Sequence, residues 1–119
     1  MSNKVAIIGV RNPSISYENW KEKYQDLILS YKPESIVSGG AKGIDSYAKK
    51  LSDDLNIFLL EFKPDYKTYG KNAPLVRNEL IVKNSDVIIA FPSESSKGTY
   101  DTIRKAKKLN KIVRVCLLK

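Results

Sequence analysis

The chain has 119 residues, of which 42% are apolar, and its formal net charge is +8 with no histidine and one cysteine. This composition predicts one folded domain over residues 1–119, and it excludes an internal disulfide, histidine-based nucleophile pairs and histidine-containing zinc sites. No apolar run approaches a membrane span of about 20 residues. Residues 1–4 lead straight into a predicted strand, so we expect no signal peptide. With a single cysteine, the expected location is the cytoplasm. We expect no metal and no cofactor, apart from a bound nucleotide.

Short apolar runs alternate with amphipathic segments along the chain. The apolar runs predict strands at residues 4–9, 35–38, 57–62, 86–91 and 111–118. Helical spacing predicts helices at residues 17–30, 43–55, 73–84 and 98–109, with Ser16 and Asn72 as N-caps and Asn56 as a C-cap. The alternation predicts an α/β fold. We expect a single three-layer domain whose five-stranded parallel sheet, in the order 3-2-1-4-5, has helices on both faces.

The longest irregular stretch covers residues 63–71, which hold Pro64, Tyr66, Tyr69, Gly70 and three lysines. Long irregular stretches in a compact domain are often functional loops. We therefore expect a mobile loop over a site, in which the two tyrosines either stack on a base or simply pack against the protein.

A glycine-rich stretch, Ser38-Gly39-Gly40-Ala41-Lys42-Gly43-Ile44-Asp45, joins the second predicted strand to the second predicted helix. Three glycines in five residues indicate a backbone that bends sharply and comes close to something. The start of the helix supplies free N–H groups and a partial positive charge, which suit a phosphate. The stretch matches neither G-x-G-x-x-G nor G-x-x-x-x-G-K-[ST], so an ordinary dinucleotide dehydrogenase or NTPase is disfavoured.

Each of the six glycines ends a predicted strand or follows one before the next helix is established. In a parallel sheet the loops after the strands meet at the carboxyl edge, so we expect a ligand site there, with Arg11 or Arg77 gripping a phosphate. Asp45 would either take a ribose hydroxyl or only cap its helix, and the hydroxyls of Ser93 and Ser95 would help to hold phosphate oxygens. The expected ligand-binding residues are Gly9, Arg11, Asn12, Ser38, Gly39, Gly40, Lys42, Gly43, Asp45, Arg77, Asn78, Pro92, Ser96, Gly98 and Thr99.

These residues carry a resemblance to a known family. The stretch V-S-G-G-A-K-G-I-D, from Val37 to Asp45, is similar to the nucleotide-binding signature of the SLOG superfamily. That superfamily includes the DNA-processing protein A (Smf) family and the LOG phosphoribohydrolases. Further motifs resemble its YspA-type branch in order, namely Gly9-Val10-Arg11, Tyr69-Gly70-Lys71-x-Ala73, Arg77-Asn78, Ser85 to Pro92, and Lys97 to Thr102. The resemblance implies a Rossmann-like fold that binds a nucleotide-derived ligand, such as NAD or ADP-ribose, and it suggests a homodimer.

The chain departs from the LOG pattern at the residue that matters for catalysis. LOG enzymes carry P-G-G-x-G-T-x-x-E, whose glutamate helps to cleave an N-glycosidic bond. Here Thr102 holds the place of that glutamate, and Asp101 lies one residue early, turned about 100° away on a helix. If the chain is an enzyme, its candidate catalytic residues are Arg77, Asp101 and Glu79, with Glu94 as another nearby carboxylate.

Three functions stay open at this point. The main expectation is a binding or sensing domain for a nucleotide or nucleotide-derived ligand at the carboxyl edge of the sheet. The first alternative is a small LOG-type hydrolase of an N-glycosidic or phosphoribosyl bond. The second is single-stranded nucleic-acid binding of the DNA-processing type, to which the lysine-rich surface would contribute unless that surface is merely solvated. No membrane partner is expected.

Overall fold

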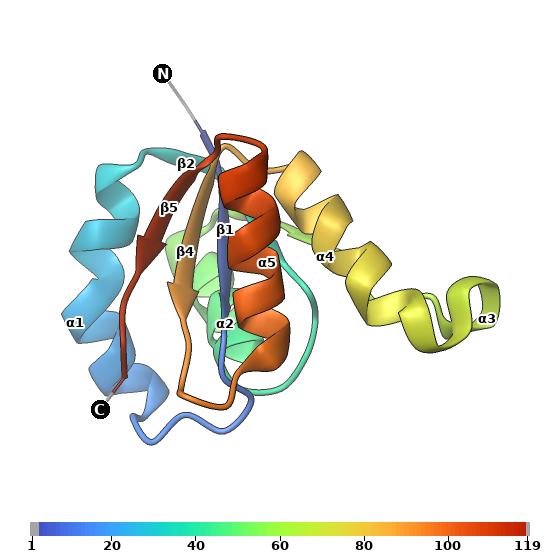
Figure 1. Ribbon diagram of the computed structural model, residues 1–119. Helices are drawn as coiled ribbons and strands as arrows, with labels where there is room; N and C mark the ends of the chain where they lie inside the picture. The colour runs from blue at the N-terminus through green and yellow to red at the C-terminus, as the bar shows by residue number, and fades with distance from the viewer. Residues whose placement is uncertain (1–2, 119) are drawn as a thin grey trace.

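Five parallel strands form the centre of the computed structural model, which describes residues 3–118 (Figure 1). The strands are β1 (Asn3–Gly9), β2 (Pro33–Ser38), β3 (Phe58–Glu61), β4 (Val87–Phe91) and β5 (Ile112–Val115). They lie in the order β3-β2-β1-β4-β5, so the predicted order is confirmed. The order reverses between β1 and β4, and the loops that follow these two strands therefore diverge and leave a crevice at the carboxyl edge.

The central strands are apolar because both of their faces are buried. Along β1, Val5 and Ile7 belong to the core on one side of the sheet, whereas Ala6 and Ile8 belong to the core on the other side. Every residue of β4 is buried. A parallel sheet covered on both faces gives such continuous apolar runs, which is why these two strands were predicted closely from the sequence.

Two long helices cover each face of the sheet. The helices are α1 (Tyr17–Ser30), α2 (Ile44–Leu55), α4 (Ala73–Lys83) and α5 (Lys97–Lys108). Trp20 and Leu51 place α1 and α2 against one core, and Ile81 and Ile103 place α4 and α5 against the other. In Figure 1, α5 lies in front of the sheet and α2 lies behind it. The three-layer prediction is confirmed. Across residues 3–118, no helix combines the length and apolar character that crossing a membrane needs.

The three predicted helix caps lie at helix ends, and two of them have the expected capping geometry. The Ser16 hydroxyl accepts a hydrogen bond from the Asn19 N–H at 3.2 Å. Asn56 ends α2 in the left-handed conformation, with a φ of 53°. Asn72 does hold the N-cap position of α4, but it also ends a short 3-10 helix, η1 (Gly70–Asn72), and its side chain makes no capping bond.

The stretch predicted as a mobile loop is helical instead. It contains α3 (Tyr66–Tyr69), where the Asp65 carboxylate accepts a hydrogen bond from the Thr68 N–H at 3.1 Å. The 3-10 helix η1 follows and leads directly into α4. In Figure 1 this segment projects beyond the start of α4. The prediction of a loop folded over the site is therefore wrong.

The two edge strands are shorter than predicted. β3 and β5 have 4 residues each, against the predicted ranges 57–62 and 111–118. Each edge strand pairs on one side only, with β2 and β4 respectively. Apolar side chains beyond the strand ends, such as Ile57, Phe62 and Leu117, extended the apolar pattern without extending the strand.

Candidate functional site

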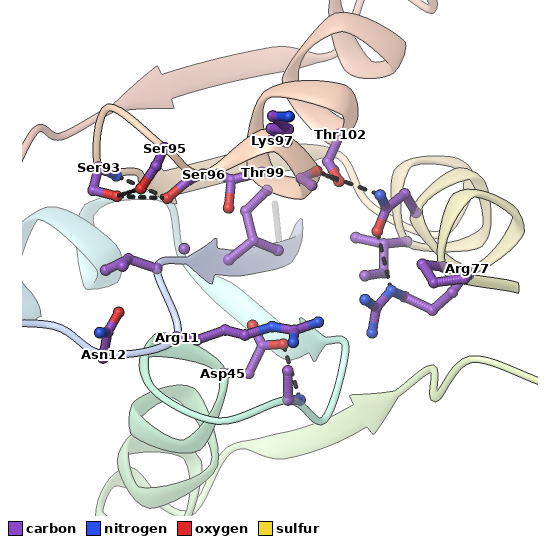
Figure 2. Close-up of a pocket in the computed structure, with 18 residues that line it drawn as sticks. Arg11, Asn12, Asp45, Arg77, Ser93, Ser95, Ser96, Lys97, Thr99 and Thr102 are labelled. Carbon is purple, nitrogen blue, oxygen red and sulfur yellow. Dashed lines mark hydrogen bonds between the residues drawn. The ribbon is translucent and has the colours of Figure 1, made fainter. Parts of the chain in front are cut away.

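A cavity of about 350 Å³ opens at the carboxyl edge of the sheet, between the loops that follow β1 and β4 (Figure 2). Small-molecule sites typically measure about 300–1,000 Å³, so this carboxyl-edge cavity is large enough for one nucleotide-sized group. It is lined by Ile8, Gly9, Val10, Arg11, Asn12, Ala41, Asp45, Pro74, Arg77, Asn78, Ile81, Ser93, Ser95, Ser96, Lys97, Gly98, Thr99 and Thr102.

Arg77 extends from α4 into one side of the cavity. Its Nη1 donates to the Gly39 carbonyl at 2.7 Å, and its Nε donates to the Asn78 Oδ1 at 3.0 Å. These two bonds hold the guanidinium in place, and they leave three of its five N–H groups without a partner among the described residues. Burial lowers the pKa of Arg77 from its ordinary value, yet an arginine stays charged in a protein.

Arg11 approaches the cavity from the loop after β1. Figure 2 shows its side chain extending beside Asp45. Within residues 3–118, no salt bridge involves Arg11 or Arg77. Lys97 adds a third positive charge to the wall. The cavity therefore presents guanidinium groups that no direct ion pair neutralises, and such groups bind phosphate oxygens well.

The first turn of α5 supplies backbone donors to the same cavity. The Ser96 hydroxyl does not cap the helix but accepts a hydrogen bond from the Ser93 N–H at 2.9 Å. The N–H groups of Gly98 and Thr99 donate to no protein atom in the described part of the chain, and both residues line the cavity. Because a 12-residue helix carries a partial positive charge at its start, this end of α5 suits an anion.

One carboxylate, Asp45, stands in the cavity wall among these donors and is 8% exposed. Its Oδ2 accepts a hydrogen bond from the Ala41 N–H at 3.1 Å. Burial raises the pKa of Asp45, while the Ala41 hydrogen bond and the nearby Arg77 charge act to lower it. One oxygen of Asp45 thus has a structural role in the glycine-rich loop, and a role toward a ligand hydroxyl stays a prediction.

The glycine-rich loop packs against the protein itself. A Cβ at Gly39 would fall closer than 3.0 Å to the Arg77 guanidinium, and one at Gly43 would fall that close to the carbonyl oxygens of Val10 and Arg11. The Ile44 N–H at the start of α2 already donates to the Val10 carbonyl at 3.1 Å. The close approach predicted from these glycines is real, but its partners are Arg77 and the loop after β1. The Ile44 N–H at the start of α2 is therefore occupied, and a phosphate at this helix start stays a prediction.

The structure brings many of the predicted ligand-binding residues together and leaves others outside. Those that line the cavity are Gly9, Arg11, Asn12, Asp45, Arg77, Asn78, Ser96, Gly98 and Thr99. Those that do not line it are Ser38, Gly39, Gly40, Lys42, Gly43 and Pro92.

Sequence reasoning missed several residues of the cavity wall. Ile8 and Ile81 follow the periodic pattern of core positions, so no sequence signal separates them from the rest of the core. Thr102 lies one helical turn after Gly98, and that spacing alone predicts its position on the cavity side of α5. The other missed residues are Val10, Ala41, Pro74 and Lys97.

Of the candidate catalytic residues, only Arg77 lines the cavity, and the carboxylates Glu79 and Asp101 do not. Glu79 is exposed and pairs with Lys83 at 2.8 Å. Asp101 accepts hydrogen bonds from the Lys105 Nζ at 2.7 Å and the Asn78 Nδ2 at 3.1 Å. Burial acts to raise the pKa of Asp101, but these two donors lower it overall. The carboxylate is therefore charged and occupied, which does not favour hydrolysis of the LOG type.

Asn78 links Arg77 to α5 and is 5% exposed. Asn78→Ala is expected to lower the free energy of unfolding by about 1–3 kcal/mol, because the Nε of the half-buried Arg77 loses its acceptor. Urea denaturation measures this loss. Asn84→Ala is the matched control at the C-cap of the same helix, since the Asn84 side chain makes one exposed bond to the Leu80 carbonyl. Equal losses in the two variants would show that the buried network adds no stability.

The raised pKa of Asp45 predicts a pH-dependent stability. A carboxyl whose pKa is higher in the folded state stabilises the fold below its unfolded pKa, and this stabilisation is lost as the pH rises through the folded pKa. Asp45→Asn keeps an acceptor for the Ala41 N–H without a charge. We expect this variant to have a higher free energy of unfolding than the wild type at pH 7, by on the order of 1 kcal/mol. The difference should shrink as the pH falls toward the ordinary aspartate pKa of about 3.9. Chemical denaturation across this pH range tests it, and a constant difference would contradict the assignment.

Comparisons of sequence connect the chain to two groups of proteins. A model of the family described as DNA recombination-mediator protein A matches residues 1–56, which run from β1 to the end of α2. The gene 61 protein of Mycobacterium phage D29 is 33% identical over 79 residues, which cover 61% of this chain and 63% of the phage protein.

Two solved structures of DNA processing protein A share the fold. The protein from Helicobacter pylori, studied for its single-stranded DNA binding mode, has a TM-score of 0.71 at 25% identity, and the match covers 94% of this chain and 64% of that one. The protein from Streptococcus pneumoniae has a TM-score of 0.71 at 19% identity, with 96% of this chain and 50% of that one covered. The chain thus spans less than two thirds of the length of the proteins it matches. These likenesses favour the DNA-processing side of the predicted superfamily, and the YspA-type branch stays a prediction.

Proposed function

We propose that this chain, which belongs to the SLOG superfamily on the side of DNA-processing protein A, binds single-stranded DNA through the carboxyl-edge cavity. The observation that carries the proposal is the convergence of Arg11, Arg77 and the free N–H groups of Gly98 and Thr99 on one cavity. Each of these groups favours an anionic oxygen, and a nucleic-acid strand offers a phosphate at every nucleotide. The fold shared with the Helicobacter pylori protein, which binds single-stranded DNA, supports the same conclusion.

The cavity suits an unpaired nucleotide better than a base pair. A phosphate between the two guanidinium groups would leave its sugar and base against the apolar part of the wall, formed by Ile8, Pro74 and Ile81. A base can enter such a concave site when it is free of its partner strand. The net charge of +8 would attract the strand from a distance and would make its affinity depend on salt.

Titration of a fluorescent oligothymidylate at several salt concentrations tests the proposal. The logarithm of the association constant should fall linearly with the logarithm of the salt concentration, by about 0.7 for each phosphate neutralised on a single strand. Two arginine contacts therefore predict a slope at least as steep as about −1.4. Excess duplex of the same length should compete less well than the single strand. Absence of binding at about 50 mM salt, or an affinity that does not change with salt, would overturn the proposal.

A free nucleotide-type ligand is the second candidate. The cavity volume of about 350 Å³ and the buried Asp45 in its wall favour it, because a carboxylate can accept hydrogen bonds from a sugar hydroxyl or a base. Thermal unfolding with AMP, ADP-ribose and NAD separates the candidates. A ligand present at about 100 times its dissociation constant should add about 2.7 kcal/mol of stability. Such a shift without binding of the oligothymidylate would favour the free nucleotide.

A further inference from the structure

We infer that the projecting segment formed by Asp65, α3 and η1, here called the arm, is a stacking platform for bases of a strand whose phosphate occupies the carboxyl-edge cavity. The inference rests on the proposed single-stranded DNA binding. The arm would bind bases of a nucleic-acid strand, whereas the cavity would bind a phosphate. The two roles are distinct because no arm residue lines the cavity.

The arm presents two aromatic rings to solvent. Tyr66 is 60% exposed and Tyr69 is 47% exposed. They stand three residues apart on α3, a spacing that places side chains on one face of a helix with about 5–6 Å between their Cβ atoms. Every ring–ring contact in the described chain lies among the aromatic residues packed around Trp20, and none involves these two tyrosines. Both rings are therefore available to a planar partner.

The charge around these rings fits a nucleic-acid backbone. Lys67 and Lys71 alternate with the tyrosines, and both lysines are exposed. Within residues 3–118, neither lysine takes part in a salt bridge. The one acidic residue of the arm, Asp65, already accepts the Thr68 N–H. Interleaved aromatic and basic side chains are the combination with which proteins bind single strands without reading their sequence.

The arm is continuous with the cavity along the chain and in space. η1 leads into α4, and the first turns of α4 carry Pro74 and Arg77 to the cavity wall. α3 also contacts α4 directly. Figure 1 shows α3 just beyond the start of α4. A strand that leaves the cavity past Arg77 along the start of α4 would run toward the two tyrosines of the arm.

Oligonucleotides of two lengths separate the arm from the cavity. We propose to compare the double variant Y66A/Y69A with the wild type by fluorescence anisotropy, using oligothymidylates of about 4 and about 20 nucleotides. Stacking of two bases predicts at least a tenfold loss of affinity for the long strand and a change of less than about twofold for a strand that fills the cavity alone. Y66F/Y69F keeps both rings and should restore the affinity. Phe58→Ala removes an exposed ring on β3, outside the arm, and serves as the matched control.

The outcomes distinguish the arm from the cavity. A wild-type affinity of Y66A/Y69A for the long strand, together with a large loss in Arg77→Ala, would overturn the platform and keep the proposed function. Loss in Y66A/Y69A without loss in Arg77→Ala would support the platform and overturn the cavity assignment. If the wild type binds neither strand, both are overturned. Thermal unfolding should be unchanged in Y66A/Y69A, because the two exposed rings pack against no other ring among residues 3–118.

Discussion

Gly43→Ala is expected to lower the free energy of unfolding by about 3–5 kcal/mol. Gly43 has a φ of +76° and a ψ of −125°, a region that residues with a Cβ rarely adopt. A Cβ there would also fall closer than 3.0 Å to the carbonyl oxygens of Val10 and Arg11. The Ile44 N–H bonds to the Val10 carbonyl at the same place, so neither chain segment can move away without losing that bond. Urea denaturation followed by circular dichroism measures the loss.

Two other glycines of the chain serve as matched controls for this variant. Gly70 has similar backbone angles, a φ of +55° and a ψ of −129°, but no atom lies within 4 Å of the position that a Cβ would take there. Gly70→Ala should therefore cost only the backbone strain, about 1–3 kcal/mol. Gly98 has neither a positive φ nor a close neighbour, and Gly98→Ala should stabilise the fold by about 0.4–1 kcal/mol. If Gly43→Ala lowers the free energy of unfolding by no more than Gly70→Ala does, the loop after β1 can move away from the added Cβ, and the predicted clash is absent.

The strands and long helices could be predicted because their patterns are local. Two-sided burial makes β1 and β4 continuous apolar runs, and the spacing of Trp20, Tyr24 and Ile28 marks the buried face of α1. The parallel topology then follows from the alternation of strands and helices, and it predicts where the loops after the strands meet. This is why residues as distant in sequence as Arg11 and Thr99 could be assigned to one site.

The wall of the site could be predicted less well, because it depends on which loop packs against which. The glycines at 39 and 43 predict a close approach, but sequence does not say whether a ligand or another part of the chain fills it. The structure fills those spaces with Arg77 and with the loop after β1.

The helical structure of the arm could not be predicted, for a different reason. A helix of 4 residues has no periodic pattern, and its one signal was the capping residue Asp65.

Packing of the glycine-rich loop connects the stability of the fold to the geometry of the cavity. The Gly39 carbonyl accepts a hydrogen bond from Arg77, and the lack of a Cβ at Gly39 lets the guanidinium lie against the loop. Asn78 supplies the second acceptor and is itself tied to Asp101 on α5. The Gly39 carbonyl and the Asn78 side chain thus hold Arg77 in place before any ligand binds. A donor that is already held in place loses less conformational entropy on binding.

This preorganisation predicts that Arg77→Ala lowers the affinity for single-stranded DNA by at least about 30-fold, which corresponds to about 2 kcal/mol. Three N–H groups of the guanidinium have no protein partner among the described residues, and alanine removes all of them together with the charge. The salt dependence should weaken as well, by about one phosphate contact. Fluorescence anisotropy at two salt concentrations measures both effects.

Lys83→Ala is the matched control for this loss of charge. Lys83 lies on the same helix, but it is exposed and pairs with Glu79 at 2.8 Å. Its removal lowers the net charge of the chain by the same amount as Arg77→Ala, so a general electrostatic effect would weaken binding equally in the two variants. Arg77→Lys keeps the charge but not the fork of donors, and we expect it to recover little of the affinity if phosphate is held in a bidentate manner. A folded Arg77→Ala protein that binds DNA like Lys83→Ala would contradict a specific role for the cavity.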